Sequence, residues 1–304
     1  MTDYQQYLDE KVHQLRIVSQ AQWDYLKYSN VSEWLDDNFK NDVEGKYYAT
    51  KILLHTIYYS KKDIEKLLNF GLYEKIYGET IKTELIAAQN IYISNSEAEA
   101  KVNELKKASF FVPLLDSNKP SESGNSVVGD LVHKLNISEK QVDFHWNITD
   151  EKLKDCKILI FVDDCVGSGN QLKNFWNSSK TSNLKAICKK YNIKVYFLVL
   201  LAYNKSIDIL MSSGKLENVS VIVCDILTDK NRVFSENNNM WDGTERESAI
   251  TYFEKIKKER GVHFSGYKNL DFAVILHDRL PNWSLPIFWK EMTGWKALLK
   301  RKSS

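Results

Sequence analysis

The chain contains 304 residues, of which 43% are hydrophobic and 27% are charged, with 42 Lys and Arg side chains against 40 Asp and Glu. These values describe a globular protein and argue against an intrinsically disordered chain or a strongly basic nucleic-acid-binding protein. The low numbers of Gly (12) and Pro (4) exclude collagen-like and low-complexity architectures. The length is sufficient for one large domain or two ordinary ones.

The distribution of apolar residues and cysteines argues against two further classes of protein. No run of 18 consecutive apolar residues is present, and the first 15 residues lack the apolar stretch of a signal peptide, so we expect a cytoplasmic protein without a membrane partner. The four cysteines form no C-x-x-C pair, which argues against a thiol-exchange or zinc-ribbon protein.

The N-terminal third has the pattern of amphipathic helices, because apolar residues recur at intervals of three and four from Tyr4 to Ala88. Asn30 and Ser60 each precede an acidic residue by three positions, which predicts helix starts, and two glycines predict breaks at Gly71 and Gly78. We therefore expect a helical N-terminal domain over residues 1–95. Because this part is slightly acidic, it is better suited to binding a protein partner than a nucleic acid.

The pattern changes after residue 95. Ser96 and Glu99 predict another capped helix that extends to about Lys107, and short apolar runs then alternate with helical segments. We expect these runs to form strands: Phe110–Val112, Ile158–Val162, Val195–Leu201, Val219–Val223 and Phe272–Leu276. Such alternation predicts an α/β domain over residues 96–304, with a Rossmann-like, mainly parallel sheet and flanking helices. Ligands of such sheets bind beyond the carboxyl ends of the strands.

One of the predicted strand ends carries an unusual combination of residues. The run that ends at Val162 continues with Asp163 and Asp164, and a glycine-containing turn then leads into a helix from Gln171. Two adjacent carboxylates can accept hydrogen bonds from vicinal ribose hydroxyls or bind a hydrated Mg²⁺ ion. The glycines of this turn let a ligand come close to the backbone, and the serine adds a hydroxyl group. Together with the free amides at the start of the following helix, these groups favour phosphate binding. The residues of this turn are Gly167, Ser168, Gly169 and Asn170.

This stretch resembles the signature of the type I phosphoribosyltransferases, in which an apolar strand is followed by two acidic residues, two apolar residues and a loop that binds a 5′-phosphate. The resemblance implies that Asp163 and Asp164 bind ribose and Mg²⁺ and act in catalysis. The phosphate of phosphoribosyl pyrophosphate or of a nucleotide would then bind the loop Gly167–Asn170 and Gln171. Family loops usually end with Thr where this chain has Gln171, and purine-specific members carry an acidic base where it has Gly167.

A second loop is expected to contact the ligand. Residues 120–126 are rich in turn-forming types, follow the first predicted strand and precede an apparently helical segment, Val127–Leu135. In the resembling family a loop at this place binds pyrophosphate through backbone amides, which implies the same role for Ser123, Gly124 and Ser126. An ordinary surface loop is the alternative interpretation of the same composition.

The C-terminal part extends the resemblance. The segment Arg279–Trp289 contains two prolines, which predict an extended and non-helical course, and it would form a hood-like segment after the sheet. Together with the upstream motif, this segment resembles phosphoribosyltransferase-like effectors of bacterial conflict systems, some of which occur in anti-phage operons and retron cassettes. Asn282 and Trp283 are candidates for covering a base or ribose, whereas Phe288 and Trp289 suit core packing.

Two main functional hypotheses remain open at this point. The first is a glycosyltransferase or nucleotide hydrolase that acts on a ribose-phosphate ligand with Mg²⁺. The second is a catalytically silent module that senses a nucleotide or binds a partner with the same pocket. Nucleic-acid binding is a weaker third hypothesis that rests on the basic tail, Lys290–Lys302. The sequence contains no Gly-x-Ser-x-Gly elbow, no P-loop lysine after the glycine turn and no His-Glu-x-x-His motif.

Overall fold

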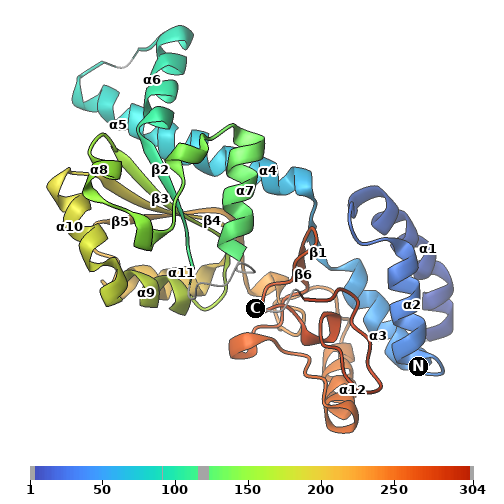
Figure 1. The fold of residues 1–304 in the computed structure, drawn as a ribbon. Coiled ribbons are helices and arrows are strands. Elements are labelled where there is room, and N and C mark those ends of the chain that lie inside the picture. Colours follow the sequence, from blue (N-terminus) through green and yellow to red (C-terminus); the bar gives the residue numbers. More distant parts are fainter. Residues whose placement is uncertain (1–3, 91, 116–122, 302–304) are drawn as a thin grey trace. The chain divides into compact units, whose positions relative to one another are not determined.

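The computed structural model describes residues 4–90, 92–115 and 123–301, and it divides into two compact units (Figure 1). Unit 1 is formed by both ends of the chain, up to Ile64 and from Leu227, and unit 2 comprises residues 65–226. This division differs from the expected boundary after residue 95. The reason is that the first helices share a core with the C-terminal segment, whereas the helices that follow residue 65 pack against the sheet of unit 2.

Unit 1 consists mainly of helices and extended segments. Its helices are α1 (Tyr4–Gln22), α2 (Tyr28–Phe39), α3 (Val43–Leu54) and α12 (Glu245–Arg260), with short 3₁₀ turns η5 (Asp229–Asn231), η6 (Tyr267–Asn269) and η7 (Pro286–Phe288). A two-stranded parallel sheet joins β1 (Ile57–Tyr59) to β6 (Val274–Leu276), with Tyr58 opposite Ile275. The predicted strand at Phe272–Leu276 therefore exists, but it does not belong to the main sheet.

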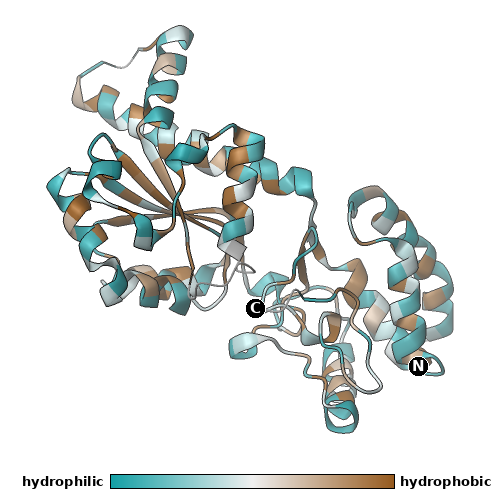
Figure 2. Cartoon of the chain, in the orientation of Figure 1, coloured by the Kyte–Doolittle hydropathy of each residue, from teal (hydrophilic) through white to brown (hydrophobic). Residues whose placement is uncertain are grey.

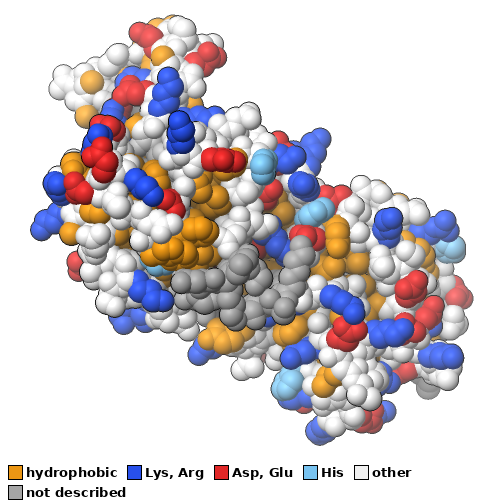
Figure 3. Space-filling view, in the orientation of Figure 1, with side chains coloured by type: hydrophobic (Ala, Val, Ile, Leu, Met, Phe, Trp, Pro, Cys, Tyr) orange, Lys and Arg blue, Asp and Glu red, His pale blue; other side chains and the backbone are white. Residues whose placement is uncertain are grey.

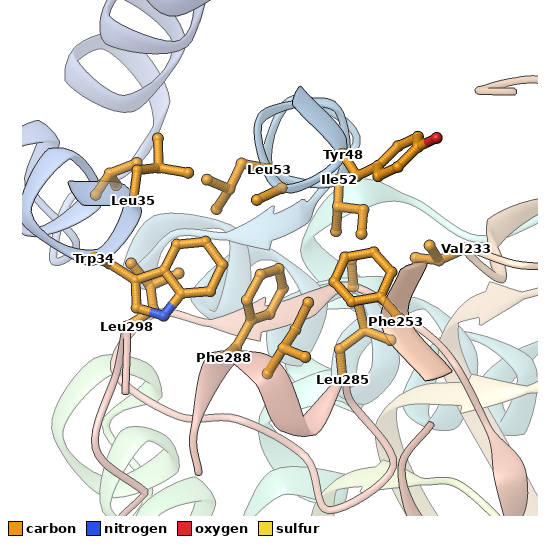
Figure 4. Packing of buried hydrophobic residues seen from close by; sticks show 14 of the residues in the cluster. Trp34, Leu35, Tyr48, Ile52, Leu53, Val233, Phe253, Leu285, Phe288 and Leu298 are labelled. Carbon is orange, nitrogen blue, oxygen red and sulfur yellow. The ribbon is translucent and has the colours of Figure 1, made fainter. Parts of the chain in front are cut away.

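The core of unit 1 is rich in aromatic rings. Trp34 packs edge-to-face against Phe288, with ring centroids 5.9 Å apart, and Tyr48 packs against Phe253 (Figure 4). These rings come from α2, α3, α12 and the C-terminal segment. Large buried rings supply much of the apolar area that stabilises such a core.

Unit 2 is a parallel α/β unit. The boundary between the two units falls within α4 (Lys61–Asn69). The main sheet of unit 2 has the strand order β2-β3-β4-β5. The strands are β2 (Ser109–Pro113), β3 (Ile158–Val166), β4 (Lys194–Tyr203) and β5 (Val219–Leu227). The helices are η1 (Phe70–Gly78), α5 (Glu79–Ala87), α6 (Asn95–Lys107), α7 (Ser123–Leu135), α8 (Asp150–Leu153), α9 (Asn170–Trp176), α10 (Ser182–Lys190) and α11 (Asn204–Ser212), with 3₁₀ turns η2 (Glu139–Gln141), η3 (His145–Asn147) and η4 (Ser179–Thr181).

The sheet is covered on both faces, as the continuous apolar runs predict. β2, β3 and β4 are parallel, with Phe110 opposite Leu159 and Leu159 opposite Val195. Figure 2 shows the strands as the most hydrophobic part of this unit. One face packs against α9 and α10 through Phe175 and Ile187, and the other faces α7 and η1. The expectation of an α/β fold with a mainly parallel sheet is confirmed.

Two of the predicted helix starts differ from the structure. α6 begins after Ser94, whose side chain forms a capping box with Glu97, so the predicted start at Ser96 is two residues late. α2 begins at Tyr28 and contains Asn30, which therefore does not cap it. The predicted start at Ser60 is confirmed, because the Asp63 amide donates to the Ser60 Oγ and the Ser60 amide donates to the Asp63 carboxylate.

The two glycines predicted as breaks lie within continuous helical backbone. Gly71 and Gly78 belong to η1, a wide π-type segment that connects α4 directly to α5. A β-carbon on Gly71 would lie 2.6 Å from the Cys224 sulfur and would also collide with the Leu198 side chain. Gly71 is therefore required for close packing of this helix on the sheet rather than for a turn.

Among the described residues, no helix is both long enough and apolar enough to cross a bilayer.

Candidate functional site

The acidic pair lies inside a strand rather than after it. β3 continues to Val166, four residues beyond the predicted end at Val162, because Asp163 pairs with Val199 and Val166 pairs with Ala202 on β4. On its other side β2 ends with Pro113 opposite Val162, and the Leu114 amide donates to the Val162 carbonyl oxygen at 2.9 Å. Among the described residues, β3 thus continues past the last residue of β2 while it remains paired with β4.

Both acidic residues are buried near the carboxyl end of β3. Their side chains have 2% and 5% of their surface exposed, and the Asp163 carboxylate accepts a hydrogen bond of 2.9 Å from the Asp164 amide. Successive residues of a strand ordinarily point to opposite faces of the sheet. Phe161 and Val166 nevertheless lie in one hydrophobic cluster, although five positions separate them, so the alternation is interrupted in this part of β3.

The predicted phosphate loop forms the turn between β3 and α9. Gly167 and Gly169 are buried, Ser168 is half-buried and Asn170 is exposed. Gly169 has a φ of +72°, a left-handed conformation that glycine adopts without strain, and the Asn170 amide lies 3.5 Å from the Ser168 Oγ. A tight turn of this kind directs backbone amides outward beside the strand end. Gln171, also predicted to contact ligand, is half-buried in the first turn of α9.

The start of α7 lies against the same strand ends. A β-carbon on Gly124 would be 2.8 Å from the Leu114 carbonyl oxygen and 3.2 Å from the Val162 carbonyl oxygen, so only glycine fits this contact. Ser126 is exposed one turn further along. Of the predicted pyrophosphate loop, residues 120–122 lie outside the described residues. Ser123 begins α7, but its side chain is likewise outside the described part.

Two features of this region were not identified from the sequence. Asn204 follows β4, beside the loop, and its buried Oδ1 atom accepts no hydrogen bond within the described part of the chain. The rule that ligands bind at the carboxyl ends of parallel strands could have indicated this residue. Lys173 of α9 lies next to Lys215, whose side-chain hydrogen bond and positive charge lower the pKa of Lys173. Lys215 lies at the C-terminal end of α9, where its carbonyl oxygen accepts a hydrogen bond of 3.1 Å from the Asn177 side chain.

The region offers few ligands for a metal ion. No group of three or more His, Cys, Asp or Glu side chains within the described ranges is arranged to bind a metal. Mg²⁺ usually keeps several waters and is bound by one or two carboxylates together with substrate phosphates. Asp163 and Asp164 are the carboxylates in this region that could hold such an ion together with a phosphorylated ligand.

Of the two C-terminal residues considered as a cover for a base, Trp283 is buried and Asn282 is exposed. Trp283 is 2% exposed and packs edge-to-face on Phe272, with ring centroids 5.3 Å apart. Asn282 is exposed, and its carbonyl oxygen accepts a hydrogen bond of 3.0 Å from Tyr267. Phe288 lies in the core of unit 1 with Trp289 packed against it. Trp283 is therefore a core residue. Phe288 and Trp289 also pack in the core, as the sequence suggested for these two residues.

A mainly parallel sheet with an acidic pair at one strand end, followed by a glycine-containing turn and a helix, defines a phosphoribosyltransferase-like α/β protein. A family model described as PRTase-CE matches residues 31–301, and the chain belongs to this family. No curated protein and no solved structure matches the chain.

Proposed function

We propose that this protein binds a ribose 5-phosphate ligand, phosphoribosyl pyrophosphate or a nucleotide, together with Mg²⁺ at the carboxyl end of β3. The observation that carries the proposal is the position of two buried carboxylates near the end of this strand, between the glycine turn and the start of α7. Membership of the PRTase-CE family supports the same ligand class.

In this proposal the ligand lies across the end of the strand. Its 5′-phosphate contacts the amides of Gly167–Asn170. A pyrophosphate or further phosphate group extends toward the start of α7 at Gly124. The ribose then lies above Asp163 and Asp164, and a ribose hydroxyl or base amide can donate to the orphan Oδ1 atom of Asn204.

The arrangement suits chemistry at the anomeric carbon. Cleavage of a glycosidic or pyrophosphate bond there develops an oxocarbenium-like positive charge, which nearby carboxylates stabilise without forming a covalent bond. Such a reaction depends on positioning and charge stabilisation more than on a strong base, so it does not require an acidic residue at Gly167. The outcome would be glycosyl transfer or hydrolysis of a nucleotide.

Calorimetric titration with phosphoribosyl pyrophosphate and with nucleoside monophosphates, each with Mg²⁺, tests the ligand. The double variant Asp163→Asn/Asp164→Asn conserves side-chain volume and is expected to lose binding. Asp155→Asn is the matched control, because Asp155 is exposed in the turn that precedes β3. Thermal unfolding of each variant verifies that it is folded. Equal affinity of the double variant and the wild type would contradict the proposal.

Turnover distinguishes an enzyme from a nucleotide-sensing module. A chromatographic assay for released base or pyrophosphate, carried out at saturating ligand, would detect the enzymatic activity. Binding that depends on Asp163 and Asp164 without turnover would support the sensing module instead.

We also propose an effector role in anti-phage defence, for which a retron cassette is one setting. In this role the N-terminal helical region binds a protein partner. This role rests on the resemblance of the upstream motif and the C-terminal segment to conflict-system effectors. Plaque counts on bacteria that express the wild type or the Asp163→Asn/Asp164→Asn variant test it. We expect protection to require the intact acidic pair, and equal plaque counts with both would count against the role.

A further inference from the structure

Unit 2 contains a pocket of about 670 Å³ that the ribose-phosphate site does not use. The pocket lies between α7 and the segment Val142–Trp146, on the side of β2 away from β3. Most of its wall is apolar: Pro113, Leu115, Val128, Val132, Val142, Phe144 and Trp146. Figure 3 shows hydrophobic side chains gathered on this face of the unit, to the left of the position of α7 in Figure 1.

The outer wall of the pocket is held in place by polar contacts. The Asp143 carboxylate accepts hydrogen bonds from the Phe144 amide (2.8 Å) and the Asn147 side chain (2.9 Å) and forms an ion pair with Lys152. The Asp143 amide donates to the Phe111 carbonyl oxygen of β2 at 3.2 Å. The wall is therefore attached to the edge of the sheet, and the pocket does not need to be created by a ligand.

Two aromatic rings of this wall are stacked and partly exposed. Phe144 and Trp146 lie parallel, with ring centroids 4.8 Å apart and planes 1° apart, and 37% and 44% of their surface is exposed. Exposed large rings are costly in water, and a parallel pair offers its outer faces for a further planar group.

The floor of the pocket is open because α7 carries a glycine there. Gly129 lies within the helix, where glycine is less favourable than alanine, and a β-carbon at this position would meet no atom within 4 Å. Neither packing nor a left-handed backbone requires this glycine. Its effect is to leave space in the pocket.

We propose that this pocket binds a planar heteroaromatic molecule without a phosphate group, of the size of a nucleobase or nucleoside. The volume lies within the range of small-molecule pockets, and the stacked rings favour a planar ligand. The polar residues of the described lining are Asn125, His133, Glu139 and Asp143, and no Lys or Arg is among them, which disfavours an anionic ligand. Because Asp143 is already paired with Lys152, Glu139 is the carboxylate that offers an acceptor for ring amino groups. Apart from Asn125, which lies between Gly124 and Ser126, the lining residues differ from those of the ribose-phosphate proposal.

Calorimetric titration of the full chain with adenosine, cytidine and AMP tests the proposal. We expect at least one nucleoside to bind, and AMP to bind this pocket more weakly because its phosphate approaches two carboxylates. Gly129→Leu should abolish nucleoside binding by filling the floor, whereas Gly129→Ala should retain most of it. Trp146→Ala should weaken binding by about tenfold, the effect of losing one stacking partner. Tyr267→Ala removes a similarly exposed ring from unit 1 and should bind as the wild type does.

Two results would overturn the proposal. The first is failure of both nucleosides to bind the folded protein at millimolar concentration. The second is nucleoside binding that survives Gly129→Leu but is lost in Asp163→Asn/Asp164→Asn, which would assign the nucleoside to the end of β3.

Discussion

Lys51 of α3 is almost completely buried, and its nearest carboxylate is that of Glu245, with the exposed Asp242 further away at 3.7 Å. Its ammonium group lies 2.5 Å from Glu245 of α12, with 6% of the lysine exposed, and the rings of Tyr7, Tyr47 and Trp241 surround it at 5.5 to 6.0 Å. Burial raises the pKa of Glu245, but hydrogen bonds from Lys51 and Tyr47 outweigh this effect and lower the pKa below its usual value. This buried pair links the two chain segments that form unit 1.

The pair predicts a pH-dependent stability. A carboxyl group with a lower pKa in the folded state stabilises the fold above its unfolded pKa, and this contribution is lost as the pH falls through the folded pKa. Glu245→Gln leaves the lysine charge buried and should lower the free energy of unfolding at pH 7 by about 3 kcal/mol. The difference from the wild type should shrink below about pH 4. Urea unfolding at several pH values measures the difference in unfolding free energy between the variant and the wild type. Glu247→Gln, on the exposed side of α12, is the control. A difference that does not change with pH would contradict the assignment.

A second prediction for a single residue concerns Gly169. Its φ of +72° is unfavourable for alanine, although a β-carbon would lie at an ordinary 3.5 Å from the Ser206 carbonyl oxygen. Gly169→Ala should therefore cost about 1 kcal/mol in unfolding free energy and should also weaken phosphate-ligand binding, because the loop must change its backbone. Gly214→Ala, at a φ of +64° with open space around it, should cost a similar amount but leave binding unchanged. Equal ligand affinities for both variants would argue against the loop as the phosphate site.

The positions of the acidic residues show what sequence can and cannot predict about the site. The apolar run ending at Val162 correctly indicated β3 and drew attention to Asp163 and Asp164. The pattern could not predict that the strand continues through both acids, because aspartate disfavours strands and the extension depends on pairing with β4. Asn204 was overlooked because a single amide after a strand has no distinctive pattern.

At the level of elements, the strands of the main sheet were predictable because each contains a short apolar run, which in β2, β3 and β4 is buried on both faces. β2, β3, β4 and β5 all contain the predicted residues. β1 was missed because it has only three residues, and its strand character depends on pairing with β6. The ends of helices were less predictable, as the shift from Ser96 to Ser94 illustrates, since several Ser and Glu residues there have the spacing of a capping box.

The two helical glycines of unit 2 predict opposite effects of one substitution. Gly129→Ala should raise the free energy of unfolding by up to about 1 kcal/mol, because alanine favours helix and its β-carbon meets no atom. Gly71→Ala should lower it, because the new methyl group collides with Leu198 and the Cys224 sulfur. Urea unfolding of both variants measures the two changes. Destabilisation by Gly129→Ala would show that the pocket floor is more crowded than described.

At the scale of the whole molecule, unit 1 is built from both ends of the chain, which a linear search for domain boundaries cannot reveal. The sequence correctly indicated a helical N-terminal region and an α/β region. It did not indicate that Trp34 and Tyr48 pack against Phe288 and Phe253, more than 200 positions away. Such contacts depend on tertiary packing between amphipathic segments, and the sequence pattern specifies only that an apolar face exists.

This arrangement predicts how fragments fold. A fragment of residues 1–95 lacks the aromatic residues of α12 and the C-terminal segment, so it should fail to fold cooperatively. A fragment of residues 65–226 retains the core around Phe161 and Phe197 and should show a cooperative thermal transition. Circular dichroism during heating measures both. Cooperative unfolding of the 1–95 fragment would contradict the division into these two units.

The central claim is that a ribose-phosphate ligand binds across the carboxyl end of β3. Hydrogen–deuterium exchange of the full chain with and without phosphoribosyl pyrophosphate and Mg²⁺ tests it most directly. We expect slower exchange at residues 163–172 and at the start of α7, with α12 unchanged as an internal control. Unchanged exchange over residues 163–172 at a saturating ligand concentration would contradict the claim.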